Sequence, residues 1–155
     1  MEPGDHDPAL GKLRSCGKVA PTAELKIVNS SGDTLAPNEV GEIIYRSKSV
    51  MKGYWQNSEA TEKSISSGWF STGDAGYLDE EGYLYIHDRI KDMIVSGGEN
   101  VYPAEVENAL FDHPAIGDVA VIGVPDEKWG EAVKAVVVLK PGSTAGEEEI
   151  IAHSR

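Results

Sequence analysis

Alternating apolar and polar side chains predict antiparallel strands in the first half of the chain. Residues 23–28 and 40–46 alternate enough to form two strands with one apolar face each. A second pair of apolar segments, 77–78 and 83–86, flanks the acidic stretch 79–82, which ends in glycine. Such a stretch between two strands is typical of a hairpin turn, so we expect these segments to pair.

One short helix interrupts this strand pattern. Residues 57–65 begin with Asn57 and Ser58, either of which can cap a helix, and Glu59 follows near the positive end of the helix dipole. The chain up to about His87 is therefore expected to be antiparallel β-structure with one helix.

The pattern changes in the second half of the chain. Two strongly apolar, β-branched runs at 118–124 and 132–139 predict a pair of neighbouring strands. Pro103 at a first helical turn predicts a helix over 104–110, and a further helix is expected to begin at Glu147. We therefore expect an α+β fold with a β-rich unit at 1–88, followed by a small unit at 89–155 with a short sheet and packed helices.

Composition and charge narrow the class of protein. The 155 residues are 40% hydrophobic and 26% charged, which is ordinary for a globular protein, and the formal net charge is −12. This sign argues against a nucleic-acid groove, which needs a basic surface, and no apolar run approaches the roughly 20 residues of a transmembrane helix. The single Cys16 favours a reducing, cytoplasmic setting. The four histidines show no metal-ligand spacing, so no metal site is predicted.

Asp74 and Arg89 form the most suggestive pair of polar residues. They lie fifteen positions apart on either side of the predicted hairpin, which can bring them to one end of a sheet. A carboxylate accepts two hydrogen bonds from a vicinal diol, and a guanidinium offers a rigid fork of donors. This combination can hold a ribose. The competing interpretation is that 71–74 forms an ordinary turn and that Arg89 makes a surface ion pair.

Three motifs resemble one known family. They read GWFSTGD at 68–74, GYLYIHDRIKDMI at 82–94 and SGGENVYP at 96–103. Together they are similar to the adenylate-forming (AMP-binding) superfamily, and the third motif resembles its acyl-CoA synthetase or fatty-acid–CoA ligase branch. The resemblance extends from about Gly11 to the end of the chain.

The resemblance implies roles for six residues. Asp74 and Arg89 would bind the ribose hydroxyls of ATP or AMP, and Lys91 would lie at the hinge between the two domains of the family. The loop Gly97, Gly98 and Glu99 would line the channel for the pantetheine thiol of CoA. The plainer interpretations are a linker lysine at 91 and a simple hairpin turn at 97–98.

The same resemblance implies an ATP-dependent acid–CoA ligase. ATP, Mg²⁺ and CoA would be its cofactors, and its substrate would be a carboxylic acid, with a fatty acid favoured. Residues 1–88 would be the end of the large N-terminal AMP-binding domain, and 89–155 the start of a truncated C-terminal domain. The phosphate-binding loop and the C-terminal lysine of the family are absent, so no catalytic residue is assigned and the chain alone is expected to be inactive.

Two alternatives stay open at this point. One is a different adenylating enzyme, either an acyl-AMP ligase or an adenylation domain that loads a carrier protein. The other is a non-catalytic module that retains the fold. The acid and the oligomeric state are not indicated by the sequence.

Overall fold

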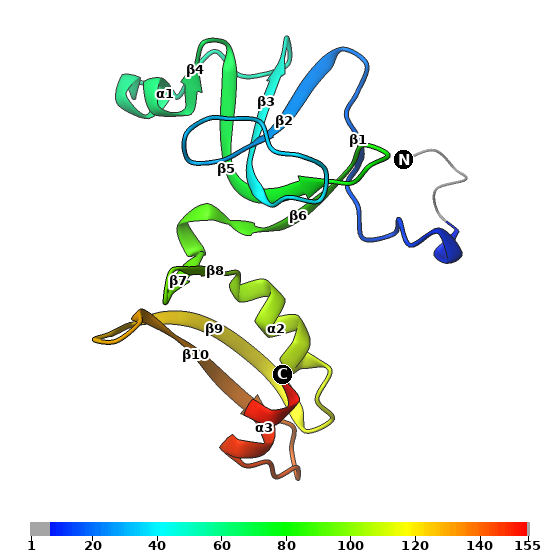
Figure 1. The fold of residues 1–155 in the computed structure, drawn as a ribbon, viewed down its shortest axis with the longest axis vertical. Coiled ribbons are helices and arrows are strands. Elements are labelled where there is room, and N and C mark those ends of the chain that lie inside the picture. The colour runs from blue at the N-terminus through cyan, green and yellow to red at the C-terminus, as the bar shows by residue number, and fades with distance from the viewer. Residues whose placement is uncertain (1–6, 155) are drawn as a thin grey trace. The chain divides into compact units, whose positions relative to one another are not determined.

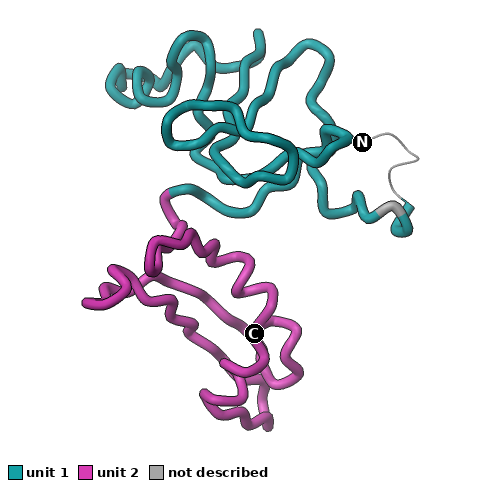
Figure 2. The backbone as a smooth tube through the Cα atoms, viewed as in Figure 1, with its two compact units in different colours: residues 1–90 teal, residues 91–155 magenta. Residues whose placement is uncertain are grey.

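The structure, a computed structural model, describes residues 7–154 and divides the chain into two compact units between Ile90 and Lys91 (Figure 2). Residues 1–6 of the predicted first unit lie outside the described residues. The α+β fold class with mostly antiparallel strands is confirmed. The assignment of the units to parts of two larger domains stays a prediction.

Unit 1 is an antiparallel sheet, whose strands differ in length, with one α-helix (Figure 1). The strand order is β1-β6-β5-β3-β2, and β4 pairs with β5. Its elements are η2 (Pro8–Leu10), β1 (Gly17–Lys18), β2 (Ala23–Val28), β3 (Gly41–Ser47), α1 (Ser58–Ser64), β4 (Ile65–Ser66), β5 (Trp69–Leu78) and β6 (Tyr83–Arg89).

The sequence pattern explains most of unit 1. Ile27 of β2 and Ile43 of β3 face each other across the pair of strands and are 3% and 4% exposed, so the predicted alternation does bury one face. The predicted helix is confirmed as α1, where the Asn57 side chain accepts a hydrogen bond from the N–H of Ala60. Its end was predicted one residue too far, because Ile65 already belongs to β4.

The predicted hairpin between β5 and β6 is also confirmed, and Asp79 organises its turn. One carboxylate oxygen of Asp79 accepts hydrogen bonds from the N–H groups of Glu81 and Tyr83, at 3.0 and 2.9 Å. The other accepts one from Lys12 Nζ at 2.7 Å. Partial burial raises the pKa of the Asp79 carboxyl, but these donors, Lys12 foremost, lower it, and the net pKa lies below its ordinary value.

The Asp79→Asn substitution should therefore lower the free energy of unfolding of unit 1 by about 1–2 kcal/mol near neutral pH, because it removes a charge-assisted hydrogen bond. The folded pKa lies below the unfolded value of about 3.9, so the carboxylate stabilises the fold above about pH 4. This contribution is lost as the pH falls through the folded pKa. Urea unfolding from pH 7 to pH 2, followed by NMR signals of unit 1, should show the difference shrinking at acid pH. Asp33→Asn, on an exposed turn, is the control, and an equal effect there would contradict the assignment.

Unit 2 consists of a small antiparallel sheet with two α-helices, drawn from yellow-green to red in Figure 1. The strand order is β8-β7-β10-β9. The elements are η3 (Ile90–Asp92, at the boundary of the units), β7 (Ile94–Ser96), β8 (Glu99–Val101), α2 (Pro103–Phe111), β9 (Ile116–Asp126), β10 (Gly130–Leu139) and α3 (Glu147–His153).

The core of unit 2 joins the sheet to α2. Ile94 of β7, Leu110 of α2 and Ile116 of β9 are almost fully buried and pack together with Val121. The two predicted strands are confirmed as β9 and β10, which pair along nearly their whole length. None of the helices in residues 7–154 is long and apolar enough to cross a membrane.

Candidate functional site

A bulge in β5 carries Asp74. Three residues of β5, 72–74, lie opposite the single residue Ile43 of β3, because the register of the two strands shifts there. Gly73 has a φ of 76°, a left-handed conformation that favours glycine. The turn predicted at 71–74 is therefore wrong: the residues with turn propensity form a bulge inside a strand instead.

Asp74 and Arg89 lie directly opposite each other where the β5–β6 ladder ends. Arg89 Nε is 3.9 Å from Asp74 Oδ1, and the two side chains are 66% and 36% exposed. An exposed pair at this distance contributes little to stability. Among residues 7–154, neither side chain has another ion-pair partner, so both can bind a ligand from solvent.

This geometry fits a vicinal diol. The ionised carboxylate of Asp74 has acceptor positions for two hydroxyl groups, and the fork of Arg89 can donate to oxygens beside it. Because both residues are on paired strands of one sheet, their backbones hold them in register. The residues present therefore fit the ribose of a nucleotide.

Lys91 lies in the single 3₁₀ turn η3, immediately after the boundary between the two units. Its side chain is 70% exposed, and its Nζ is 4.0 Å from Asp92 Oδ1. Short 3₁₀ turns are common connectors between larger elements. The position is compatible with the predicted hinge, which stays a prediction.

Gly97 and Gly98 form the two-residue turn of the β7–β8 hairpin, and Glu99 begins β8. Their φ angles of 61° and 88° are those of a tight hairpin turn that needs positive φ at both positions. All three residues are exposed. The simple hairpin-turn interpretation therefore describes the backbone correctly, while the role beside CoA remains a prediction.

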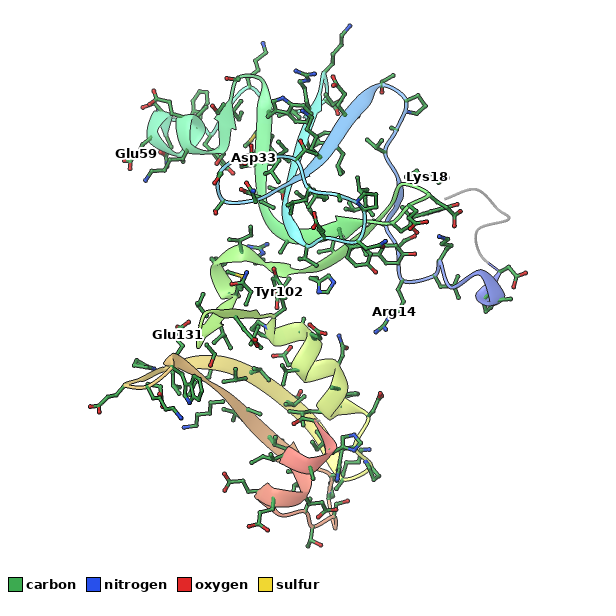
Figure 3. All side chains as sticks on the ribbon, viewed as in Figure 1. Arg14, Lys18, Asp33, Glu59, Tyr102 and Glu131 are labelled. Carbon is green, nitrogen blue, oxygen red and sulfur yellow. The ribbon has the colours of Figure 1, made fainter. Side chains whose placement is uncertain are left out.

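Trp129 fixes this glycine turn in place. The N–H of Gly97 donates to the carbonyl oxygen of Trp129 at 2.9 Å, and a Cβ atom at Gly97 would lie 2.7 Å from Trp129 Cε3. Glu131 on β10, labelled in Figure 3, makes a second contact with this region. Its Oε2 accepts a hydrogen bond from the N–H of Val95 at 2.9 Å. The sequence analysis gave neither Trp129 nor Glu131 a role at this turn. No spacing in the sequence signals these contacts, because they join segments about thirty residues apart.

Thr72 is a further residue to which the sequence analysis assigned no role in the nucleotide site. Its hydroxyl lies between Ile43 of β3 and the backbone of Asp74. The signal available in the sequence was a threonine two residues before the candidate aspartate, a spacing at which a hydroxyl can bind the backbone.

The part of the chain that the structure describes contains no group of three or more His, Cys, Asp or Glu side chains that could hold a metal ion. We therefore assign no residue of this chain to Mg²⁺.

Two family models match the chain. The model of the AMP-binding enzyme matches residues 3–55, and the model of the AMP-binding enzyme C-terminal domain matches residues 105–155.

Curated relatives match nearly the whole chain. The 2-succinylbenzoate–CoA ligase of Geobacillus kaustophilus is 50% identical over 147 residues, which is 95% of this chain and 30% of that protein. The long-chain-fatty-acid–CoA ligase of Bacillus subtilis is 50% identical over 93% of this chain and 26% of that protein. A fatty acid–[acyl-carrier-protein] ligase of Streptomyces coeruleorubidus is 44% identical over 92% of this chain and 27% of its own length. The chain thus spans less than a third of the length of these relatives.

A solved structure supports the same likeness. The o-succinylbenzoate CoA synthetase of Bacillus subtilis, in complex with its acyl-adenylate intermediate, superposes with a TM-score of 0.85 at 43% identity. The match covers 94% of this chain and 29% of that one.

Proposed function

Because the chain belongs to the AMP-binding, adenylate-forming enzyme family, we propose that it is part of a ligase that activates a carboxylic acid with ATP and transfers it to CoA. In the first step, an oxygen of the acid attacks the α-phosphorus of ATP, giving acyl-AMP and pyrophosphate. In the second step, the CoA thiol attacks the acyl carbon, a proton leaves the sulfur, and AMP departs. No covalent bond to the protein is needed.

The observation that carries this proposal is the Asp74–Arg89 pair at the open end of the β5–β6 ladder. In our proposal the pair holds the ribose hydroxyls through both steps and keeps the α-phosphorus in position. Fixing a reactant in this way lowers the barrier without proton transfer by the protein. Lys91 would serve as the hinge, and Gly97, Gly98 and Glu99 would line the thiol channel. Mg²⁺ is proposed to accompany ATP, without a ligand from this chain.

A fatty acid is the proposed substrate class, and the 50% identical long-chain-fatty-acid–CoA ligase supports it. The equally identical 2-succinylbenzoate–CoA ligase makes an aromatic acid the competing class. We also propose a cytoplasmic setting, because Cys16 is a free thiol.

The second candidate is an enzyme that loads a carrier protein in place of CoA. The 44% identical fatty acid–[acyl-carrier-protein] ligase favours this alternative specifically. A phosphopantetheine arm presents the same thiol as CoA, so the glycine turn alone does not separate the two acceptors.

A chimera tests the proposal. The 147 matched residues of the Geobacillus kaustophilus ligase would be replaced by those of this chain, so that the remaining sequence supplies the parts that this chain lacks. AMP release would be measured with 2-succinylbenzoate and with short, long and aromatic acids, with and without CoA. We expect acid- and CoA-dependent AMP release. A folded chimera that forms no acyl-AMP would contradict the ligase function, and pyrophosphate release that is indifferent to CoA would favour the carrier-loading alternative.

A further inference from the structure

We propose that Thr72 is a positioning residue for the nucleotide site, holding Asp74 at the distance that a ribose diol requires. This inference rests on the proposed ribose role of Asp74. The side chain of Thr72 would not touch the ligand; it would act through the backbone of its neighbour.

The Thr72 hydroxyl bridges two strands. It donates a hydrogen bond to the carbonyl oxygen of Ile43 on β3 at 2.8 Å, and it accepts one from the N–H of Asp74 at 3.1 Å. A hydroxyl has a single hydrogen to donate, so the bond to Ile43 directs its lone pairs toward other donors. The backbone of Asp74 is thereby linked through one atom to a strand on which it has no direct register partner.

The bulge is the reason that such a link is needed. The three residues 72–74 lie opposite the single residue Ile43 and interrupt the ladder between β3 and β5, which leaves the N–H of Asp74 without a backbone partner on β3. Gly73 adds a left-handed residue beside it and has open space around its Cα. Without the hydroxyl, the backbone of Asp74 would be held only by its pairing with Arg89 on β6, and the Asp74 carboxylate would sample more positions.

Arg89 is held independently of Thr72. Its N–H donates to the Asp88 carboxylate at 2.7 Å, so each member of the diol-binding pair has its backbone fixed by a nearby side chain. Removing the Thr72 hydroxyl should therefore loosen one half of the pair and leave the other unchanged.

Thr61 provides a matched control. Its hydroxyl donates to the carbonyl oxygen of Asn57 at 2.8 Å and accepts a hydrogen bond from the N–H of Tyr54 at 2.9 Å, in the same unit but within α1. Thr61→Val thus removes a hydroxyl of the same bonding type away from the site. If Thr72 had a purely structural role, Thr72→Val and Thr61→Val would change the AMP affinity by the same amount.

The test is an NMR titration of the 155-residue chain with AMP, for the unchanged chain and for Thr72→Val, Thr72→Ser and Thr61→Val. Affinities are normalised to the folded fraction seen in the same spectra, and the exchange rate of the Asp74 amide proton is recorded. We expect Thr72→Val to weaken AMP binding by about fivefold, the effect of one lost hydrogen bond, and to speed exchange at Asp74. Thr72→Ser should stay within about twofold of the unchanged chain, as should Thr61→Val.

Three results would overturn the proposal: AMP affinity unchanged in Thr72→Val, an equal loss in Thr72→Ser, or an equal loss in Thr61→Val. Absence of AMP binding by the unchanged chain would instead contradict the ribose role of Asp74. In that case, unaltered Asp74 exchange in Thr72→Val would also exclude the hydroxyl as the group that holds this backbone, so the two failures can be told apart.

Discussion

Replacing Asp74 by alanine is expected to weaken the binding of AMP to this chain by at least about tenfold, the largest effect on ligand binding that the structure predicts. The carboxylate is the only proposed acceptor for the two ribose hydroxyls, and hydrogen bonds to an ionised group are stronger than those between neutral groups. Because Asp74 is 36% exposed and its ion pair with Arg89 spans 3.9 Å, the substitution should leave the fold almost unchanged.

NMR titration with AMP measures the affinity of the Asp74→Ala variant, and Asp33→Ala is the control. Asp33 is an exposed acid of the same unit, so its removal changes the net charge of −12 by the same amount. It therefore corrects for the general repulsion between an acidic protein and a nucleotide. An affinity loss in Asp33→Ala as large as in Asp74→Ala would mean that the carboxylate has no specific role. Arg89→Lys should lose part of the affinity, since lysine keeps the charge but not the fork.

Gly76→Ala is expected to produce the largest loss of stability, about 3 kcal/mol in the free energy of unfolding of unit 1. Gly76 is buried in β5, two residues after Asp74. A Cβ atom there would overlap the carbonyl oxygen of Tyr85 on β6 and lie 2.9 Å from Ile43 Cδ1 on β3. The backbone oxygen cannot move aside without breaking the β5–β6 ladder that aligns Asp74 with Arg89.

Urea unfolding followed by NMR signals of unit 1 measures this loss separately from unit 2. Gly73→Ala is the comparison: its added Cβ meets nothing within 4 Å, but its φ of 76° is unfavourable for alanine. We expect that variant to lose about 1 kcal/mol. A Gly76→Ala protein as stable as Gly73→Ala would show that the strands can separate at this point. That result would contradict the claim that the β5–β6 ladder holds Asp74 and Arg89 in rigid alignment.

Local patterns in the sequence predicted the parts of the site that depend on neighbouring residues. The hairpin around Asp79 follows from its acidic, glycine-ended turn, and that hairpin brings Asp74 close to Arg89. The one-residue register shift between Ala75 and Gly76 that places the two directly opposite each other does not follow from the turn. The α+β class and the β9–β10 pair follow in the same way from alternation and from β-branched runs.

The parts that escaped prediction depend on contacts between distant segments. Thr72 and Gly73 have the local properties of a turn, and only the register against Ile43 on β3 converts them into a bulge. The N–H of Gly97 bonds the carbonyl oxygen of Trp129, more than thirty residues away, and the Trp129 ring leaves no room for a Cβ atom at Gly97. Turn propensity cannot distinguish these outcomes, because it does not describe which strand lies opposite.

The ribose role of the β5–β6 end is tested most directly by comparing AMP with 2′-deoxy-AMP in NMR titrations of the unchanged chain. The two ligands share the base and phosphate and differ by one hydroxyl of the diol. We predict that AMP shifts the amide signals of Asp74 and Arg89 and that the deoxy analogue binds at least about fivefold more weakly, as expected for a lost hydrogen bond to a charged acceptor. Equal affinities, or shifts confined to other parts of the chain, would contradict the assignment of this site to the ribose.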